Sequence, residues 1–255
     1  MKIYFLGTGT SQGIPVIGNK HPVCLSTNLK DKRLRSSILI EWKGSKILID
    51  CGPDFRQQML RIDNDSLDAI LFTHEHADHT AGLDDIRPYC FMESKAMPVF
   101  AQNRVVESLK RRFDYIFETT NRYPGAPSIE IHEIEAYSDF TVDNKTIKPL
   151  LVNHGSLPIL GYRFKDFAYL TDVKTLNEAT YEQLHNLDVL VINALRIQEH
   201  PTHNNLDEAL EHIRKIKPKK AYLTHIGFQL GFHDEIQATL PENVFLAYDN
   251  LTIEI

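Results

Sequence analysis

Residues 73–79 read Thr73-His74-Glu75-His76-Ala77-Asp78-His79 and directly follow the apolar run Ala69-Ile70-Leu71-Phe72. This H-x-H-x-D-H string places three imidazoles and the Asp78 carboxylate at the end of an expected buried strand. His74 and His76 are two residues apart, so on extended backbone they project to the same side. Asp78 and His79 are adjacent and diverge, so they can serve a second ion. Zn²⁺ and similar cations favour such mixtures of imidazole and carboxylate. Without a cation this cluster would be costly to desolvate, so the string predicts a metal site.

The composition is typical of a globular enzyme. The chain has 255 residues, 42% of them hydrophobic, which suits one large domain spanning residues 1–255. A net charge of −6 with scattered basic residues argues against a broad nucleic-acid surface. No apolar stretch has the length of a membrane span, and the apolar run near Met1 is too short for a secretory signal. Three cysteines (Cys24, Cys51 and Cys90) do not suggest a disulfide framework, so we expect a cytoplasmic protein.

Short apolar runs alternate with helical patterns and predict an α/β fold. The early strands are adjacent, whereas later strands alternate with helices, which favours sheets covered by helices over one doubly wound sheet. The predicted helices are 54–61, 103–117, 176–185, 206–216 and 234–240. The predicted strands are 2–7, 37–42, 46–50, 69–72, 98–101, 129–134, 146–152, 160–164, 167–170, 189–192, 221–224 and 244–247.

Three further polar residues each follow an apolar strand pattern. His154 comes after Pro149–Asn153, Asp172 after Phe167–Thr171, and His225 after Lys220–Thr224. A strand that opens into a loop is a common position for site residues. Each residue alone could equally be a surface or capped side chain. Together with the 73–79 string, the three indicate one shared metal centre.

The 73–79 string, His154, Asp172 and His225, in this order, resemble the motifs of the metallo-β-lactamase superfamily, and the resemblance covers essentially the whole chain. The resemblance implies a four-layer αβ/βα sandwich with two metals at one sheet edge. It implies that His74, His76 and His154 bind the first metal, that Asp78, His79 and His225 bind the second, and that Asp172 bridges both. A carboxylate bridge suits two dications about 3.5–4 Å apart. Asp50, in Ile49-Asp50-Cys51-Gly52, matches a position that supports the ligand loop by hydrogen bonding.

Within the superfamily the chain resembles the PhnP-type phosphodiesterases, relatives of ribonuclease Z. The segments 7–15 (GTGTSQGIP) and 79–88 (HTAGLDDIRP) carry this likeness. His203 stands 22 residues before His225, the offset of a substrate-facing histidine in those enzymes. His200 is a rival for this role, and we prefer His203 on spacing.

One feature departs from the subgroup. Many members carry a structural zinc held by a C-x-C-x-x-C run and by a histidine three residues beyond the last ligand. Here the run is Asn19-Lys20-His21-Pro22-Val23-Cys24, and the downstream position is Phe228. His21 and Cys24 alone do not complete a tetrahedral site, so we expect that this zinc is lost and that Cys24 is a packed thiol.

The predicted function is that of a dinuclear, metal-dependent hydrolase. Two divalent ions, Zn²⁺ or Mn²⁺ with Fe²⁺ also possible, lower the pKa of a bridging water, whose hydroxide attacks the substrate. Asp78 and His203 are the expected catalytic residues. The resemblance implies small phosphodiesters, such as phosphoribosyl cyclic phosphate, as substrates. Alternatives are a glyoxalase-type thioester or lactone hydrolase and a non-catalytic, PqqB-like binding protein. A nucleic-acid substrate is disfavoured, no membrane partner is expected, and a homodimer is possible.

Overall fold

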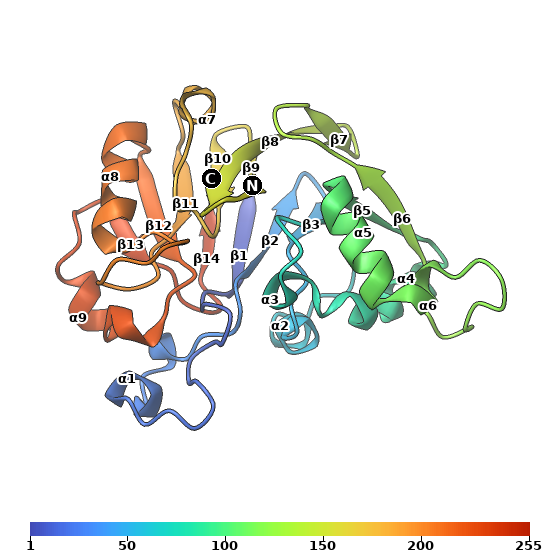
Figure 1. The fold of residues 1–255 in the computed structure, drawn as a ribbon, viewed down its shortest axis with the longest axis horizontal. Helices are drawn as coiled ribbons and strands as arrows, with labels where there is room; N and C mark the ends of the chain where they lie inside the picture. The colour runs from blue at the N-terminus through green and yellow to red at the C-terminus, as the bar shows by residue number, and fades with distance from the viewer.

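Apolar, β-branched runs from the first half of the chain, together with one strand from its end, build a seven-stranded sheet. The computed structural model describes residues 1–255, and its first sheet has the order β14-β1-β2-β3-β4-β5-β6 (Figure 1). Strands β3 to β6 run parallel, whereas β1 pairs antiparallel with both β2 and β14. The strands are β1 (Lys2–Gly7), β2 (Ser37–Trp42), β3 (Ser45–Ile49), β4 (Ala69–Leu71), β5 (Met97–Ala101), β6 (Ile129–Glu133) and β14 (Thr252–Glu254).

The second half of the chain builds a second seven-stranded sheet, in the order β13-β12-β11-β10-β9-β8-β7. Three antiparallel hairpins, β7–β8, β8–β9 and β9–β10, come first, after which β10 to β13 run parallel. The strands are β7 (Phe140–Val142), β8 (Lys145–His154), β9 (Leu157–Phe164), β10 (Phe167–Leu170), β11 (Val189–Asn193), β12 (Lys220–Thr224) and β13 (Val244–Leu246).

The two sheets pack face to face around a shared apolar core. Ile38 and Ile40 of β2 face this core together with Tyr162 and Tyr169 of the second sheet. Leu39, between the two isoleucines, points to the opposite face and packs under helices. Because these strands are buried on both faces, they read as continuous apolar runs rather than alternating patterns.

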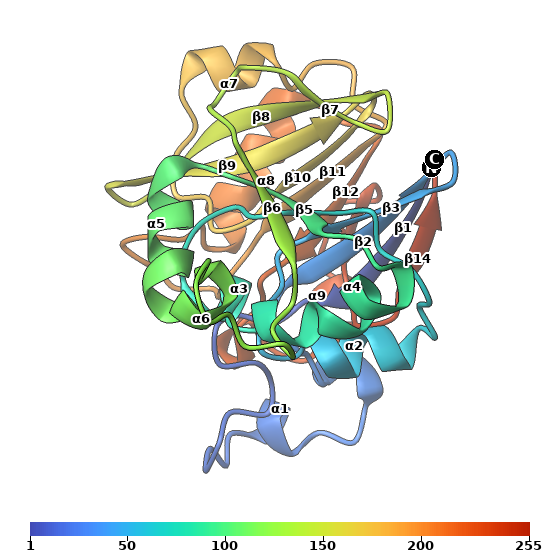
Figure 2. The same cartoon turned by 90° about the vertical axis from the view of Figure 1, so that its right-hand side faces the viewer.

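Helices cover both outer faces and complete four layers, helix, sheet, sheet and helix (Figures 1 and 2). The outer face of the first sheet carries α2 (Phe55–Arg61), α3 (Ala77–Thr80), α4 (Arg87–Glu93), α5 (Asn103–Arg112) and α6 (Asp114–Phe117). The second sheet is covered by α7 (Glu178–Glu182), α8 (Leu206–Ile216) and α9 (His233–Gln237). A loop with α1 (Pro22–Leu25) projects from the body, and the 3-10 turns are η1 (Leu29–Asp31), η2 (Leu83–Ile86) and η3 (Phe228–Leu230).

The predicted α/β class and the metallo-β-lactamase-like sandwich are confirmed, and every predicted strand is present within three residues of its predicted limits. The prediction of one continuous helix over residues 103–117 is wrong. Phe113, with φ −127°, interrupts it and separates α5 from α6. The sequence patterns missed β7, β14, α3 and α4, which are short or form through distant pairing.

None of the helices combines the length and the apolar character that crossing a bilayer requires.

Candidate metal centre

The metal centre is built where strands of both sheets end. The segment after β4 carries His74 and His76 in a loop and Asp78 and His79 in α3, so one sheet supplies the whole string. From the other sheet, β8 ends at His154, Asp172 follows β10, and His225 follows β12. All seven predicted ligands therefore converge at one edge between the sheets, in mutually overlapping clusters of possible ligand atoms.

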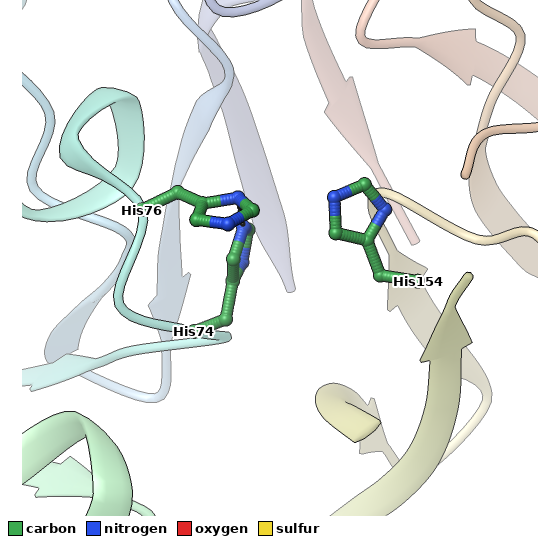
Figure 3. Close-up of side chains that lie close together, drawn as sticks. All are labelled: His74, His76 and His154. Atoms are coloured by element: carbon green, nitrogen blue, oxygen red, sulfur yellow. Dashed lines mark hydrogen bonds between the residues drawn. The ribbon is translucent and has the colours of Figure 1, made fainter. Parts of the chain in front are cut away.

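His74, His76 and His154 form the first cluster, with ligand atoms within 4.8 Å of one another. Figure 3 shows His74 and His76 on one loop, facing His154 across the gap from the other sheet. The His74 Nε2 and His76 Nδ1 atoms are 2.9 Å apart. His74 is fully buried, whereas His76 is exposed, so this side of the centre opens to solvent.

Hydrogen bonds fix which ring nitrogens face the centre. The Thr73 hydroxyl donates to Asp50 Oδ2 at 2.9 Å, so it accepts from His74 Nδ1 at 3.0 Å. His154 Nδ1 donates to the Thr202 carbonyl at 2.8 Å. Both assignments leave Nε2 as an unprotonated lone pair directed at the cluster, which is the form that binds a cation.

Asp78, His79 and His225 form the second cluster. The Asp78 Oδ2 atom lies 3.1 Å from His79 Nε2 and 3.7 Å from His225 Nε2. Both nitrogens are buried, yet neither takes part in a hydrogen bond. Buried polar groups normally have hydrogen-bond partners. Because these atoms converge without forming hydrogen bonds, their arrangement is the one that a shared cation requires.

Asp172 lies between the two clusters. Its Oδ1 is 3.2 Å from His225 Nε2, and its Oδ2 is 3.4 Å from His79 Nε2. It also forms one cluster with His74 and His79, and another with His154 and His203. Asp172 lies just after the end of β10 and adopts a φ of 55°. Asp tolerates this left-handed conformation better than most residues. Its position suits contact with two ions.

The charges of the centre favour a cation. Burial alone would raise the pKa of Asp172, but the facing imidazoles of His225 and His79 hold that pKa well below its usual range. Burial lowers the pKa of His74 well below its usual value, so this ring is neutral at neutral pH. Although burial lowers it, the carboxylates of Asp78, Asp50 and Asp172 together raise the pKa of His79 well above its usual value, so this ring holds a positive charge that a bound cation would replace. The donor set of carboxylates and imidazoles fits divalent metal ions.

Asp50 has the supporting position that the family resemblance implied. Its Oδ1 accepts from the backbone N–H of Thr73 at 2.8 Å, and its Oδ2 accepts from His79 Nδ1 at 2.7 Å. One buried carboxylate therefore orients both ends of the ligand loop. Nearby, Gly52 must lack a side chain, because a Cβ there would stand 2.1 Å from the Asp78 carbonyl oxygen.

His203 reaches the centre, and His200 stands behind it. His203 Nε2 lies 2.9 Å from Asp172 Oδ1, while its Nδ1 is 3.1 Å from His200 Nδ1. The His203 ring lies between His154 and His225, with ring centroids 4.5 Å and 5.0 Å away. Burial lowers the pKa of His203 to about 4, more than its hydrogen bond to Asp172 raises it, so the ring is neutral at neutral pH.

The opening loop lies beside the last ligand. The Thr10 backbone N–H donates to the Ile226 carbonyl at 3.1 Å, and the Ile226 N–H donates to the Thr8 carbonyl at 2.9 Å. The segment that resembled a family motif therefore holds the residue after His225 in position.

Near α1, His21 and Cys24 serve local packing. His21 Nδ1 accepts from the Val23 backbone N–H at 3.3 Å, which caps α1. Cys24 is buried in a small apolar cluster with Ile14 and Val23, against which Phe228 packs. The His21 and Phe228 rings are in contact, with centroids 5.0 Å apart.

Sequence reasoning assigned no role to two residues that orient ligands. Thr73 was part of the quoted string, and its hydroxyl links Asp50 to His74. Thr202 orients His154 through its main-chain carbonyl. Because every residue type has this group, the sequence does not indicate it.

Comparison with known proteins agrees with this geometry. The family model described as "Beta-lactamase superfamily domain" matches residues 45–226. A crystal structure described as a new diphosphatase from the PhnP family is 38% identical, with a TM-score of 0.93, covering 100% of this chain and 97% of that one.

Two curated relatives add to the comparison. An octanoyltransferase of Porphyromonas gingivalis is 41% identical over 253 residues, 98% of this chain and 51% of that protein. A ribonuclease Z of Methanopyrus kandleri is 35% identical over 81 residues, 31% of this chain and 23% of that protein. The chain thus spans about half the length of the first relative and less of the second. With its fold, its clustered ligands and the matching family model, the chain belongs to the metallo-β-lactamase superfamily.

Proposed function

We propose that this protein is a metal-dependent phosphodiesterase that acts on small phosphodiesters, such as a cyclic ribose phosphate. The proposal is supported by the likeness to a PhnP-family diphosphatase and by the partial likeness to a ribonuclease Z. The diphosphatase activity of the first of these proteins widens the proposed substrate class to diphosphates, since both reactions cleave a P–O bond at a phosphorus that carries a leaving oxygen.

The ligand roles follow from the clusters. His74, His76 and His154 would hold one divalent ion, Asp78, His79 and His225 would hold a second, and Asp172 would contact both. Bound there, divalent ions would polarise a phosphoryl oxygen and lower the pKa of water. The protein's own contribution is to orient these ligands through Asp50, Thr73 and Thr202 and to leave the His76 side open to substrate.

The position of His203 is the observation that carries the proposal. Its Nε2 is 2.9 Å from Asp172 Oδ1, so a neutral ring carries the proton on Nε2 and donates it toward the centre. Thr202 Oγ1, 3.0 Å from His203 Nδ1, suits a hydroxyl that donates to that nitrogen and keeps the proton on Nε2. A donor at this place can hydrogen-bond a phosphoryl oxygen or the departing oxygen of a phosphodiester, which acquires negative charge during cleavage.

Acyl transfer chemistry is a second candidate because of one observation, the 41% identity to a protein named octanoyltransferase. A thioester carbonyl could occupy the same centre, as the glyoxalase-type alternative requires. This candidate does not use a proton donor at His203 as directly, because a thiolate is a good leaving group without protonation. The PqqB-like, non-catalytic alternative is disfavoured because all seven ligand positions are filled.

We also propose that the substrate is a small molecule rather than a nucleic acid, and that the protein can assemble as a homodimer. The described surface of the metal centre carries no broad basic stripe, since the residues that converge there are histidines and aspartates.

A substrate panel tests the proposal. Protein loaded with Zn²⁺ or Mn²⁺ would be assayed on a cyclic ribose phosphate, on a nucleoside diphosphate and on octanoyl-coenzyme A, with His203→Ala beside the unchanged protein. We expect the phosphorus substrates to be cleaved and the thioester to be left intact. Faster turnover of the octanoyl thioester than of either phosphorus substrate would replace the proposal with the acyl alternative.

A further inference from the structure

A second cavity lies at the end of the sheets remote from the metal centre. It has a volume of about 640 Å³, within the range of small-molecule pockets. Three hairpin turns meet there: β2–β3 at Lys43, β7–β8 at Asp143 and Asn144, and β9–β10 at Lys165. The lining consists of Trp42, Lys43, Asp139, Asp143, Asn144, Lys145, Thr146, Lys148, Arg163 and Lys165.

The lining is strongly basic, although the chain as a whole is acidic. Five lining side chains are Lys or Arg and two are Asp, an excess of three positive charges in a chain of net charge −6. Basic residues concentrated against the overall charge create a local positive potential inside a concave surface, and such a surface attracts anions.

Three of the five cations have no carboxylate partner. Lys145 is buried, and its Nζ donates only to the Ser45 hydroxyl at 2.7 Å and the Asp143 carbonyl at 3.2 Å. The Asp143 carboxylate accepts from Ser45 at 2.6 Å instead and forms no ion pair with Lys145. The Lys145 ammonium therefore reaches a carboxylate only through the Ser45 hydroxyl. An anion in the cavity would give it a direct counter-ion.

Arg163 and Lys43 leave their charge available as well. The Arg163 guanidinium meets the carbonyl of Lys165 at 2.7 Å and that of Gln183, and no carboxylate. Lys43 is exposed at the β2–β3 turn and forms no ion pair. Lys148 and Lys165, by contrast, pair with Asp139 at 3.2 Å and Asp166 at 3.3 Å.

The cavity is far from the metal centre. Strand β8 begins at Lys145 in the cavity and ends at His154 in the metal centre. Ten residues of extended strand span about 30 Å. A smaller cavity of about 350 Å³ adjoins the first through Trp42, Lys43 and Lys165, and it is also lined by Met1 and Ile255. These two chain termini lie at the right of Figure 2.

We propose that this basic cavity binds a small molecule carrying two or more linked phosphate groups. Its volume suits a diphosphate or a nucleotide, and its concave shape favours a small molecule over a long polyanion. Lys145, Arg163 and Lys43 are the cations that would meet the phosphate oxygens, since charge-assisted hydrogen bonds to phosphate are their strongest available interactions. The site is distinct from the metal centre and independent of the reaction proposed there.

The chain contains a built-in reporter for this test. Trp42 is its single tryptophan and lines the cavity, so its fluorescence reports on occupancy there and not at the metal centre. Metal-loaded protein would be titrated with methylenediphosphonate and with α,β-methylene-ADP, whose P–C–P linkage resists hydrolysis. Use of both probes separates a free diphosphate from a nucleotide.

Lys43→Glu is the test variant, and Lys95→Glu is its matched control. Both lysines are exposed and without an ion pair, and both substitutions change the net charge equally. We expect a saturable change in Trp42 emission with at least one probe, weakened about tenfold in Lys43→Glu and unchanged in Lys95→Glu. Lys43→Gln, which removes the same cation without introducing a negative charge, should weaken binding as well.

Two results would overturn the proposal. One is the absence of any saturable emission change with either probe at millimolar concentration. The other is a failure of the variants to differ: Lys43→Glu binds as well as the unchanged protein, or Lys95→Glu loses as much affinity as Lys43→Glu. Either result would mean that the probe does not bind in the cavity. Saturation by the nucleotide probe alone would support the site and assign it to nucleotides.

Discussion

At the scale of the single residue, a substitution of His203 distinguishes a role in catalysis from a role in metal binding. It touches the centre through Asp172 but belongs to neither three-residue set proposed to hold an ion. We therefore expect His203→Ala to lower turnover about 10²–10⁴-fold, the usual contribution of a proton donor, while metal content stays the same. His200→Ala is the control, because His200 lies behind His203 and further from the centre, and it should change turnover much less. Undiminished turnover of His203→Ala with full metal content would remove His203 from the reaction.

Single residues were the most predictable part of the centre. The string at 73–79 places four candidate ligands in one loop, and the strand-end positions of His154, Asp172 and His225 add the rest. Their convergence is observed, while their binding of ions remains a prediction. Asp50 was expected to support the loop and does contact it. The Thr202 carbonyl could not be predicted, because any residue type supplies a carbonyl.

At the level of the element, α8 shows how a local signal specifies a helix. Asn205 accepts from the Glu208 N–H at 2.9 Å, and Glu208 accepts from the Asn205 N–H at 2.9 Å, which forms a capping box two residues after His203. Asn205→Ala should cost about 1 kcal/mol of unfolding free energy. For a chain of this size that corresponds to about 3 °C in Tm, measurable by thermal denaturation.

Glu211→Ala, an exposed substitution within the same helix, is the control for this prediction and should change Tm by much less. Equal effects of the two substitutions would mean that the cap does not contribute to stability.

Elements with a local signal were predicted well, and elements without one were not. The limits of α8 match because its cap, its amphipathic pattern and the following Pro218 all agree. Helix α3 has four residues, of which Asp78 and His79 are occupied with the centre, so no amphipathic pattern exists. Strand β14 forms only by pairing with β1 at the other end of the chain, and such long-range pairing leaves little trace in a short segment.

Across the whole molecule, a buried polar cluster ties the opening loop to the end of the chain. Arg33 donates to the Thr8 hydroxyl at 2.7 Å and lies 3.1 Å from His233 Nδ1, while Asp249 accepts from Thr8 at 2.9 Å. Burial, with the charges of Arg33 and Lys30, lowers the pKa of His233 to about 4. His233 is therefore neutral in the folded protein at neutral pH.

This arrangement predicts a pH dependence of stability. The unfolded state gains a proton at His233 near pH 6.5, whereas the folded state gains it only near pH 4. The contribution of His233 is fully present above pH 6.5 and is lost as the pH falls toward 4. His233→Gln, which keeps an acceptor for Arg33, should flatten the curve of unfolding free energy in this interval. Urea denaturation at several pH values checks it, and parallel curves for both proteins would contradict it.

The two-sheet architecture was predictable as a class but not in its detailed pairing. Adjacent early strands followed by strands that alternate with helices indicated sheets covered by helices, and the family resemblance implied four layers. The meeting of both termini and the approach of Thr8 to Asp249 depend on contacts across more than two hundred residues, and no local pattern encodes them.

The central claim is that the seven clustered residues bind metal ions that drive phosphodiester cleavage. It is tested most directly by turnover of bis(p-nitrophenyl) phosphate with protein reconstituted separately with Zn²⁺ and Mn²⁺. Asp78→Ala removes one proposed ligand, and Asp207→Ala removes an exposed carboxylate on α8 as a control. We predict metal-dependent cleavage by the unchanged protein and by Asp207→Ala, with loss of both activity and bound metal in Asp78→Ala. Full activity of Asp78→Ala, or no metal bound by the unchanged protein, would contradict the account.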